Sequence, residues 1–244
     1  MATFGLEFSD LYTRIKDYAN INNLVNADVK AKRAANDALR LIASLRNWEI
    51  LKRSSTITPI ASTQAYTLAS NFDHIISCWY VSNGVEIPID VVDDDRWNKD
   101  VLNTTDGIPS ICRITKVGGT LNIQFSPRPS SSFVSQYTTI SYDYIKKPVE
   151  LSADTDVPDI PDTGQQMAIV YLAVSDLLGK QGDVSGMTSW EMKATRLLNQ
   201  AHKIDDKKQG IGKEGENEPD NGAVDTVFGI ADFGAAAGRR NPFE

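Results

Sequence analysis

Residues 74–92 read HIISCWYVSNGVEIPIDVV. Two runs rich in apolar and β-branched residues, 74–81 and 85–92, flank the tripeptide Ser82-Asn83-Gly84. Asn-Gly between two such runs is the strongest short-range signal for a β-hairpin with a two-residue turn, because both turn positions need a positive φ. The middle of the chain is therefore expected to contain antiparallel strands joined by tight turns.

The same kind of sequence extends from residue 54 to residue 151, which is rich in Thr, Val, Ile, Ser and Tyr. Gly118-Gly119 supplies a second hairpin signal, and Ile140, Tyr142 and Tyr144 alternate toward one face. The expected strands are 56–60, 64–68, 74–81, 85–92, 110–117, 120–126 and 138–146, with a short helix near 96–102. Strands of this number and length favour a compact sandwich or barrel.

Two helices are expected before the strands. In the first, Phe8, Leu11, Tyr12, Ile15 and Tyr18 recur at helical spacing, and Ser9 is available as an N-cap. The second has one continuous apolar face from Leu24 to Trp48, with an alanine-rich first half that allows close helix approach.

Two more helices are expected after a connector rich in Pro and Asp at 154–161. The apolar face of the third runs from Met167 to Leu178, behind a capping box Thr163…Gln166. That of the fourth runs from Trp190 to Ile204, with Thr188…Glu191 as its capping box. None of the four could bury its apolar face alone, so packing them together is the economical solution.

The predicted fold class is therefore α+β, a bundle of about four helices with a small antiparallel β-sandwich or barrel inserted, followed by an extended C-terminal tail. The expected domains are a helical domain formed by 1–52 and 160–208, an inserted β domain at 53–159, and a docking tail at 209–244.

The formal net charge of −7 argues against a basic surface for binding nucleic acid. This charge is uneven, because residues 209–244 hold seven acidic and three basic side chains and leave the rest of the chain nearly neutral. No apolar run is long enough to span a bilayer, and the N-terminus has no signal-peptide pattern, so no membrane partner is expected.

No set of residues points to catalysis. Cys78 and Cys112 lie in strand-like contexts, where two buried free thiols are favoured over a disulfide. His74 and His202 have no partner at ligand spacing, and the run Asp93-Asp94-Asp95 lacks the alternation of a calcium loop. The prediction is a protein that is not an enzyme, with no catalytic residue, no metal and no cofactor.

The tail from Gln209 onward has no periodicity. A glycine-rich acidic segment cannot offset its ordering entropy, about 1–2 kcal/mol per residue, through its own contacts. Any order must therefore come from a partner. The candidate apolar anchors are Val224, Val227, Phe228, Ile230, Phe233 and Phe243.

Five stretches taken together carry a resemblance. They are LRNWEILK at 45–52, QAYTLASNFDHIISCWYV at 64–81, IQFSPRP at 123–129, SYDYIKKP at 141–148 and VPDIP at 157–161. In order and spacing the chain resembles, over about residues 5–206, the head-to-tail adaptor (connector) proteins of tailed bacteriophages, the group that includes tail tubular A and head-completion adaptors.

The resemblance implies a structural virion protein at the head–tail junction, assembled in the cytoplasm of the bacterial host. Such adaptors form a dodecameric ring beneath the portal, with tail or nozzle proteins below. Genomic DNA passes through the lumen without sequence-specific binding. The tail would dock on the portal through the six apolar anchors, with Arg239 and Arg240 as ionic partners.

Two alternatives remain open at this stage. One is a receptor- or glycan-binding virion module that uses loop aromatics such as Trp79, Tyr80 and Trp97 of the β region. The other is a cell-wall hydrolase with a carboxylate pair in its acidic loops.

Overall fold

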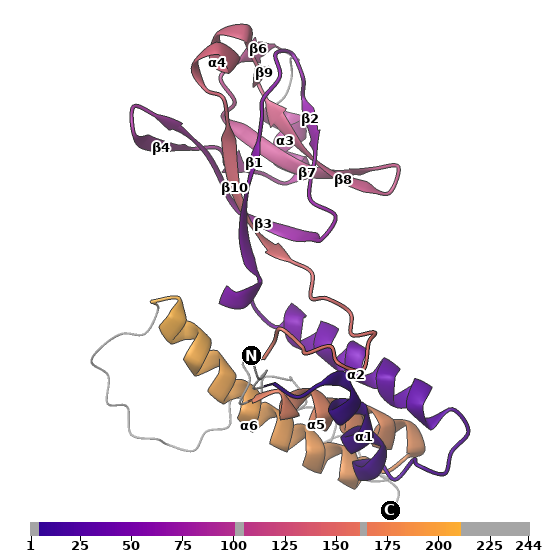
Figure 1. The fold of residues 1–244 in the computed structure, drawn as a ribbon. Helices are drawn as coiled ribbons and strands as arrows, with labels where there is room; N and C mark the ends of the chain where they lie inside the picture. Colours follow the sequence, from indigo (N-terminus) through magenta and orange to yellow (C-terminus); the bar gives the residue numbers. More distant parts are fainter. Residues whose placement is uncertain (1–4, 101–104, 162–164, 211–244) are drawn as a thin grey trace, which may run out of the picture. The chain divides into compact units, whose positions relative to one another are not determined.

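The computed structural model describes residues 5–100, 105–161 and 165–210, and the tail with its predicted anchors lies outside them. The fold is mixed α+β, as predicted. The chain divides into a helical unit, residues 1–42 with 150–244, and a β unit, residues 43–149 (Figure 1). Their boundaries lie about ten residues before the predicted ones. The existence of independently folding domains stays a prediction.

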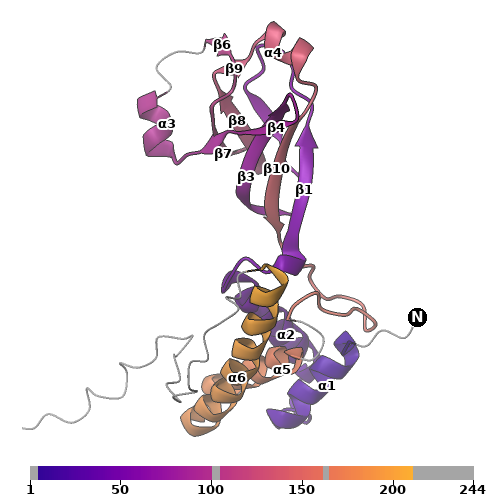
Figure 2. The same cartoon turned by 90° about the vertical axis from the view of Figure 1, so that its left-hand side faces the viewer.

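The helical unit contains the four predicted helices. They are α1 (Phe8–Tyr18), α2 (Ala27–Ser44), α5 (Met167–Gln181) and α6 (Val184–Lys208). Helix α5 lies between α1 and α6 and packs against both (Figure 2). Most of its side chains are buried, among them Ile169, Val170 and Val174. A helix that is apolar on nearly all sides belongs in a core, so α5 forms the centre of this unit.

Helix α1 has no side-chain cap, so the prediction for Ser9 is wrong. The amides of Phe8 and Ser9 donate to the carbonyls of Asp156 and Asp154, at 2.7 and 3.0 Å. The chain that returns from the β unit therefore satisfies the N–H groups at the start of this helix, which would otherwise lack partners.

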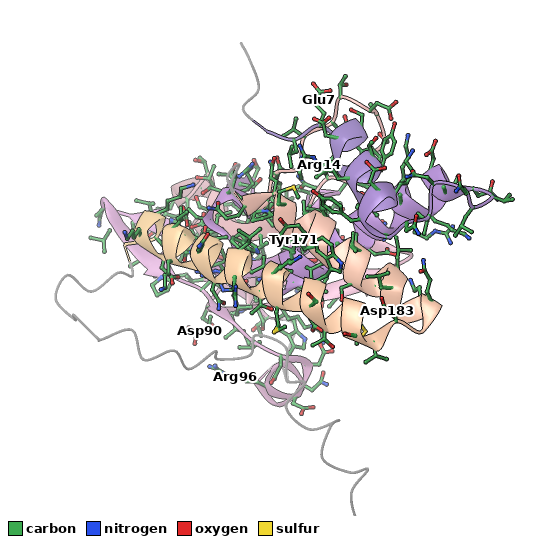
Figure 3. The ribbon with its side chains drawn as sticks, turned by 90° about the horizontal axis from the view of Figure 1, so that it is seen from below. Glu7, Arg14, Asp90, Arg96, Tyr171 and Asp183 are labelled. Carbon is green, nitrogen blue, oxygen red and sulfur yellow. The ribbon has the colours of Figure 1, made fainter. Side chains whose placement is uncertain are left out.

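The two predicted capping boxes are also wrong, because α5 and α6 begin at other residues than the boxes require. The buried Gln166 side chain accepts from the Leu6 amide at 2.7 Å and donates to the Pro158 carbonyl at 3.0 Å, while Thr163 lies outside the described residues. Helix α6 begins at Val184, before the box predicted at Thr188, because Asp183 caps it by accepting from the Gly186 amide at 2.9 Å. Figure 3 shows Asp183 at this end of α6.

Helix α2 is shorter than the predicted face. It ends at Ser44, so Trp48 is buried outside it, and Leu24 and Leu41 are exposed. Its alanines are buried.

Among its described residues, the β unit contains ten strands and two short helices. The strands are β1 (Lys52–Ile57), β2 (Ala65–Thr67), β3 (Phe72–Ser82), β4 (Val85–Pro88), β5 (Asp90–Val91), β6 (Asp106–Gly107), β7 (Ile111–Val117), β8 (Thr120–Ser126), β9 (Arg128–Pro129) and β10 (Ile140–Lys146). The helices are α3 (Asp94–Asp100) and α4 (Ser131–Gln136), and a 3-10 turn spans Glu49–Leu51.

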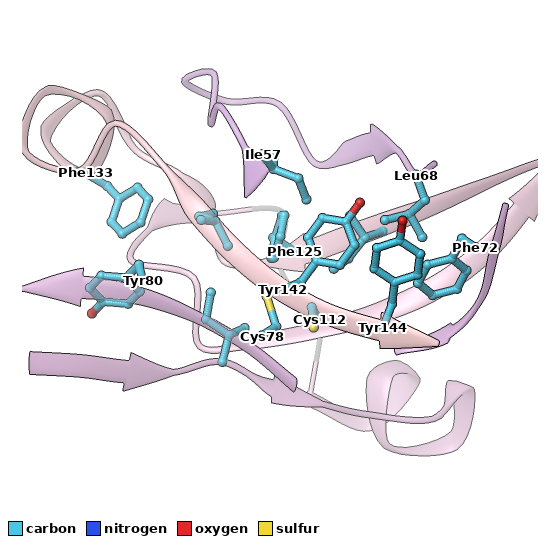
Figure 4. Packing of buried hydrophobic residues seen from close by; sticks show 13 residues of the cluster. Ile57, Leu68, Phe72, Cys78, Tyr80, Cys112, Phe125, Phe133, Tyr142 and Tyr144 are labelled. Carbon is cyan, nitrogen blue, oxygen red and sulfur yellow. The ribbon is translucent and has the colours of Figure 1, made fainter. Parts of the chain in front are cut away.

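Two four-stranded sheets, ordered β1-β10-β3-β4 and β2-β8-β7-β5, share one core. Figure 4 shows Tyr142 and Tyr144 of the first sheet and Phe125 of the second within it. Most pairings are antiparallel, but the two-residue pairings β5–β7 and β6–β9 are parallel, which the sequence did not indicate. Nor did it indicate α4, which Ser130 caps by accepting from the Phe133 amide.

Both hairpins form where predicted. Asn83 and Gly84 have φ of 50° and 78°, and Gly118 and Gly119 have 58° and 87°. Positive φ at both turn positions matches the right-handed twist of the strands.

Candidate assembly surfaces

The residues that could suggest chemistry have structural partners. Asp93 accepts from the Arg96 amide at 2.8 Å, Asp94 pairs with Arg113 at 2.9 Å, and Asp90 pairs with Arg96 at 3.3 Å (Figure 3). Asp93 therefore caps the start of α3, and the two ion pairs connect this helix to β7 and β5. Within the described ranges, no three His, Cys, Asp or Glu side chains gather as a metal site would require.

The two cysteines are free and buried where the two sheets face each other (Figure 4). A hydrogen bond with Cys112, together with burial, raises the pKa of the Cys78 thiol. A thiol held protonated is a poor nucleophile, so this pair packs the core.

The aromatic residues proposed for glycan binding are mostly buried. Tyr80 is 7% exposed and packs against Phe133, with ring centroids 5.2 Å apart. Trp97 is 4% exposed and lies beneath the Arg113 guanidinium, 4.7 Å from the ring centroid. Only Trp79 of the three is partly accessible. A glycan platform needs open aromatic faces, so the expectation of exposed loop aromatics is wrong for Tyr80 and Trp97.

The helical unit has an open groove of about 580 Å³ between α2, α5 and α6. Apolar side chains dominate its lining, including Leu41, Leu172 and Met187. Leu41 is 42% exposed although it lies in the middle of an apolar pattern. We call this feature the α2–α5–α6 groove.

A charged side chain stands at the rim of the groove. Glu191 lines it, and partial burial raises the pKa of this carboxyl. Its carboxylate makes no hydrogen bond or ion pair with any residue that the structure describes. The neighbouring rim acids Asp37 and Asp176 are instead paired, with Arg40 and Lys180. Of these three acidic side chains, Glu191 is therefore the one with which a cation of another subunit could form a new ion pair.

A second apolar feature lies at the start of α2. Leu24, Val25 and Val29 are 47%, 81% and 58% exposed. We call these three residues the α2 knob. Lys30 and Arg33 beside it are exposed, and neither forms an ion pair within the described part of the chain. The helical unit therefore presents an apolar projection with basic neighbours and an apolar groove with an acidic rim.

The sequence reasoning missed both surfaces. It placed Leu24 and Leu41 on one continuous apolar face with the alanines. In the structure the alanines of that face are buried, with Ala31, Ala34 and Ala35 at most 4% exposed. Leu24 precedes α2, which begins at Ala27, and at 100° per residue Leu41 falls at the edge of the alanine stripe, so both side chains are exposed.

These features are typical of a structural assembly protein, because exposed apolar surfaces of this kind suit contacts with neighbouring subunits. None of the described helices combines the length and apolarity needed to cross a membrane. The family model of the SU10 adaptor protein matches residues 6–213, so the chain belongs to the SU10 adaptor protein family. It is a phage adaptor protein, structural in role, which binds other virion proteins. No match is found among curated proteins.

Proposed function

We propose that the chain is one subunit of a ring-shaped head–tail adaptor that joins the portal vertex to the tail and continues the DNA channel. The observation that carries the ring is the pairing of surfaces on the helical unit, the α2 knob and the α2–α5–α6 groove. They are different patches of one subunit. Such a head-to-tail contact generates a ring when its rotation closes.

In this contact the knob of one subunit enters the groove of the next. Val25 and Val29 would cover the exposed Leu41 side chain and pack into the groove beside Leu172, removing exposed apolar surface from water. Lys30 or Arg33 would then reach the unpaired Glu191 carboxylate. The apolar contact supplies affinity, and the charge pair selects the orientation. The family resemblance implies twelve subunits.

The tail is proposed to attach this ring to the portal. Its anchors are Val224, Val227, Phe228, Ile230, Phe233 and Phe243, with Arg239 and Arg240 as ionic partners. The family model ends at residue 213, so this assignment rests on composition alone. Spaced apolar residues in a glycine-rich chain suit a segment that folds on its partner. We place the protein in the virion, after assembly in the host cytoplasm, with tail or nozzle proteins on the opposite side of the ring.

The test mixes the purified protein with portal rings of the same phage and counts decorated rings by negative-stain electron microscopy. Val25→Glu and Leu41→Glu should each abolish ring formation. Each buries an unpaired carboxylate in the contact, at a cost of about 3 kcal/mol or more. Val117→Glu, at an exposed hairpin position of the β unit (63% exposed), is the matched control.

Rings that persist in both groove and knob variants would refute the proposed contact. A chain truncated after Lys208 should keep its circular dichroism spectrum yet fail to decorate the portal. Normal decoration by the truncated chain would show that the tail is not the docking segment.

A further inference from the structure

Helix α6 has a row of basic side chains on its outward face. At 100° per residue, the four positions fall within an arc of about 80°, on the side opposite the buried Ala194, Leu198 and Ala201. No acidic residue shares that arc; Gln200 does. The four exposed residues, which we call the α6 stripe, are Lys193, Arg196, Lys203 and Lys207.

The charges of the stripe are not neutralised by their neighbours. Within the described part of the chain, none of the four forms an ion pair. Other cations of the helical unit do, for example Lys16 with Asp28 and Lys32 with Asp154. In a chain of net charge −7, four adjacent unpaired cations are a local concentration of positive charge.

The start of the stripe is held in place. The Lys193 ammonium lies 3.7 Å from the centroid of the Trp190 ring. Trp190 in turn stacks on Tyr18 at 5.1 Å and packs at 5.3 Å on Tyr171, which is labelled in Figure 3. This aromatic cluster joins α1, α5 and α6, so it fixes one end of the row to the core of the unit.

We propose that the α6 stripe contacts the phosphate backbone of duplex DNA; that this happens inside a channel rests on the proposed function. Fourteen helical residues separate Lys193 from Lys207, a rise of about 21 Å. A duplex presents one charge per 1.7 Å of axis, so about twelve phosphate charges lie along that length. Because phosphates are spaced evenly along the duplex, flexible lysine and arginine side chains in a row can reach some of them at any position. An acidic protein surface could pair with the row only if its carboxylates were spaced to match the four cations.

The contact would be weak and independent of sequence. Four phosphate contacts per subunit are few, and salt competes with each of them. A single copy would hold DNA loosely at physiological salt, and a ring would gain through repetition of the same row. The row would restrain the DNA while leaving it free to slide.

The test measures binding of the full chain to a fluorescent 24-bp duplex by anisotropy, at sodium chloride concentrations from 50 to 200 mM. With four contacts the log–log salt slope should be about −3.6, a loss of about 150-fold across the range. Arg196→Gln/Lys203→Gln/Lys207→Gln leaves one contact, so its slope should fall to about −0.9, a loss of about 3.5-fold.

The matched control is Arg14→Gln/Lys116→Gln/Lys147→Gln, which removes one arginine and two lysines from exposed positions elsewhere. It should behave as the unmodified chain. Equal slopes for the two triple variants would overturn the DNA contact.

Two further outcomes would also overturn it. If DNA binds only after Glu214→Gln/Glu216→Gln/Glu218→Gln, the occupant of the stripe is the acidic segment that follows α6. If the stripe variant stops decorating portal rings while its DNA slope is unchanged, the partner is a protein. Ring formation is scored separately by microscopy, so absence of rings in the unmodified protein would count against the proposed function and not against the DNA contact.

Discussion

One buried side chain, Asn36 of α2, forms two hydrogen bonds with the segment of chain that returns from the β unit. Its Nδ2 donates to the Leu151 carbonyl and its Oδ1 accepts from the Leu151 amide, both at 2.9 Å. Asn36 and Leu151 are 7% and 4% exposed, so water does not reach this pair readily. Asn36→Ala would leave a buried N–H and a buried C=O without partners.

The expected cost follows from those two groups. A buried polar group left without its partner costs about 1–3 kcal/mol, so losing the partners of two groups should destabilise the helical unit by about 2–6 kcal/mol. At about 3 kcal/mol, an opening equilibrium changes by about 150-fold. The Leu151 amide should therefore exchange with deuterium about two orders of magnitude faster.

Hydrogen-exchange mass spectrometry on peptides that span Leu151 measures this directly, and urea unfolding followed at 222 nm gives the global effect. Asn22→Ala is the control, because it removes an exposed bond to Asp17 of the same length, 2.9 Å. That change should stay within about 0.5 kcal/mol. If Asn36→Ala and Asn22→Ala differ by less than this, the reasoning about buried partners is wrong.

Two further predictions concern the β core and a charged turn. Phe125→Ala removes a side chain that is 0% exposed between the sheets and should cost about 3–5 kcal/mol in urea unfolding, whereas Val117→Ala at 63% exposure should be nearly neutral. Asp156 accepts from the amides of Ser152 and Ala153 at 2.7 and 2.8 Å, and these bonds lower the pKa of its carboxyl below 3.8. A lowered pKa stabilises the fold above pH 3.8 and loses that effect as the pH falls through the folded value, so Asp156→Asn should lower the urea midpoint at pH 7 and have a shrinking effect below pH 3.8. A midpoint difference that is constant with pH would contradict this assignment.

Features governed by neighbours in sequence could be predicted. Asn83-Gly84 and Gly118-Gly119 form the expected turns because the backbone of two residues determines a hairpin. The alternation of Ile140, Tyr142 and Tyr144 likewise follows from the period of a strand, and all three are buried.

Features governed by distant residues could not be predicted. Nothing near Ser9 reveals that carbonyls at 154 and 156 would replace its cap. The parallel pairing of β5 with β7 joins segments between which α3 and β6 lie in the sequence. The start of α6 was predicted wrongly for a different reason. Asp183 follows Gly182, where α5 ends, and is a good N-cap residue, but the capping box at Thr188 was chosen instead.

The same distinction between local and distant residues applies to the candidate assembly surfaces. The α6 stripe could have been found from sequence, because the spacing of Lys193, Arg196, Lys203 and Lys207 follows one helical face. The α2–α5–α6 groove could not, since it exists only once three helices pack. The predicted docking tail remains untested, because it lies outside the described residues.

The pairing of β1 with β10 has an evolutionary consequence. Lys52 lies opposite Ile145, so the chain enters and leaves the β unit at adjacent points. Antiparallel neighbours are only about 5 Å apart, so a short linker could close the same gap. Because closure entropy grows slowly with loop length, the roughly hundred residues between these points can be lengthened, shortened or exchanged at little cost to the helices. Recombination between phages could therefore replace this insert as a cassette while the helical contacts stay unchanged.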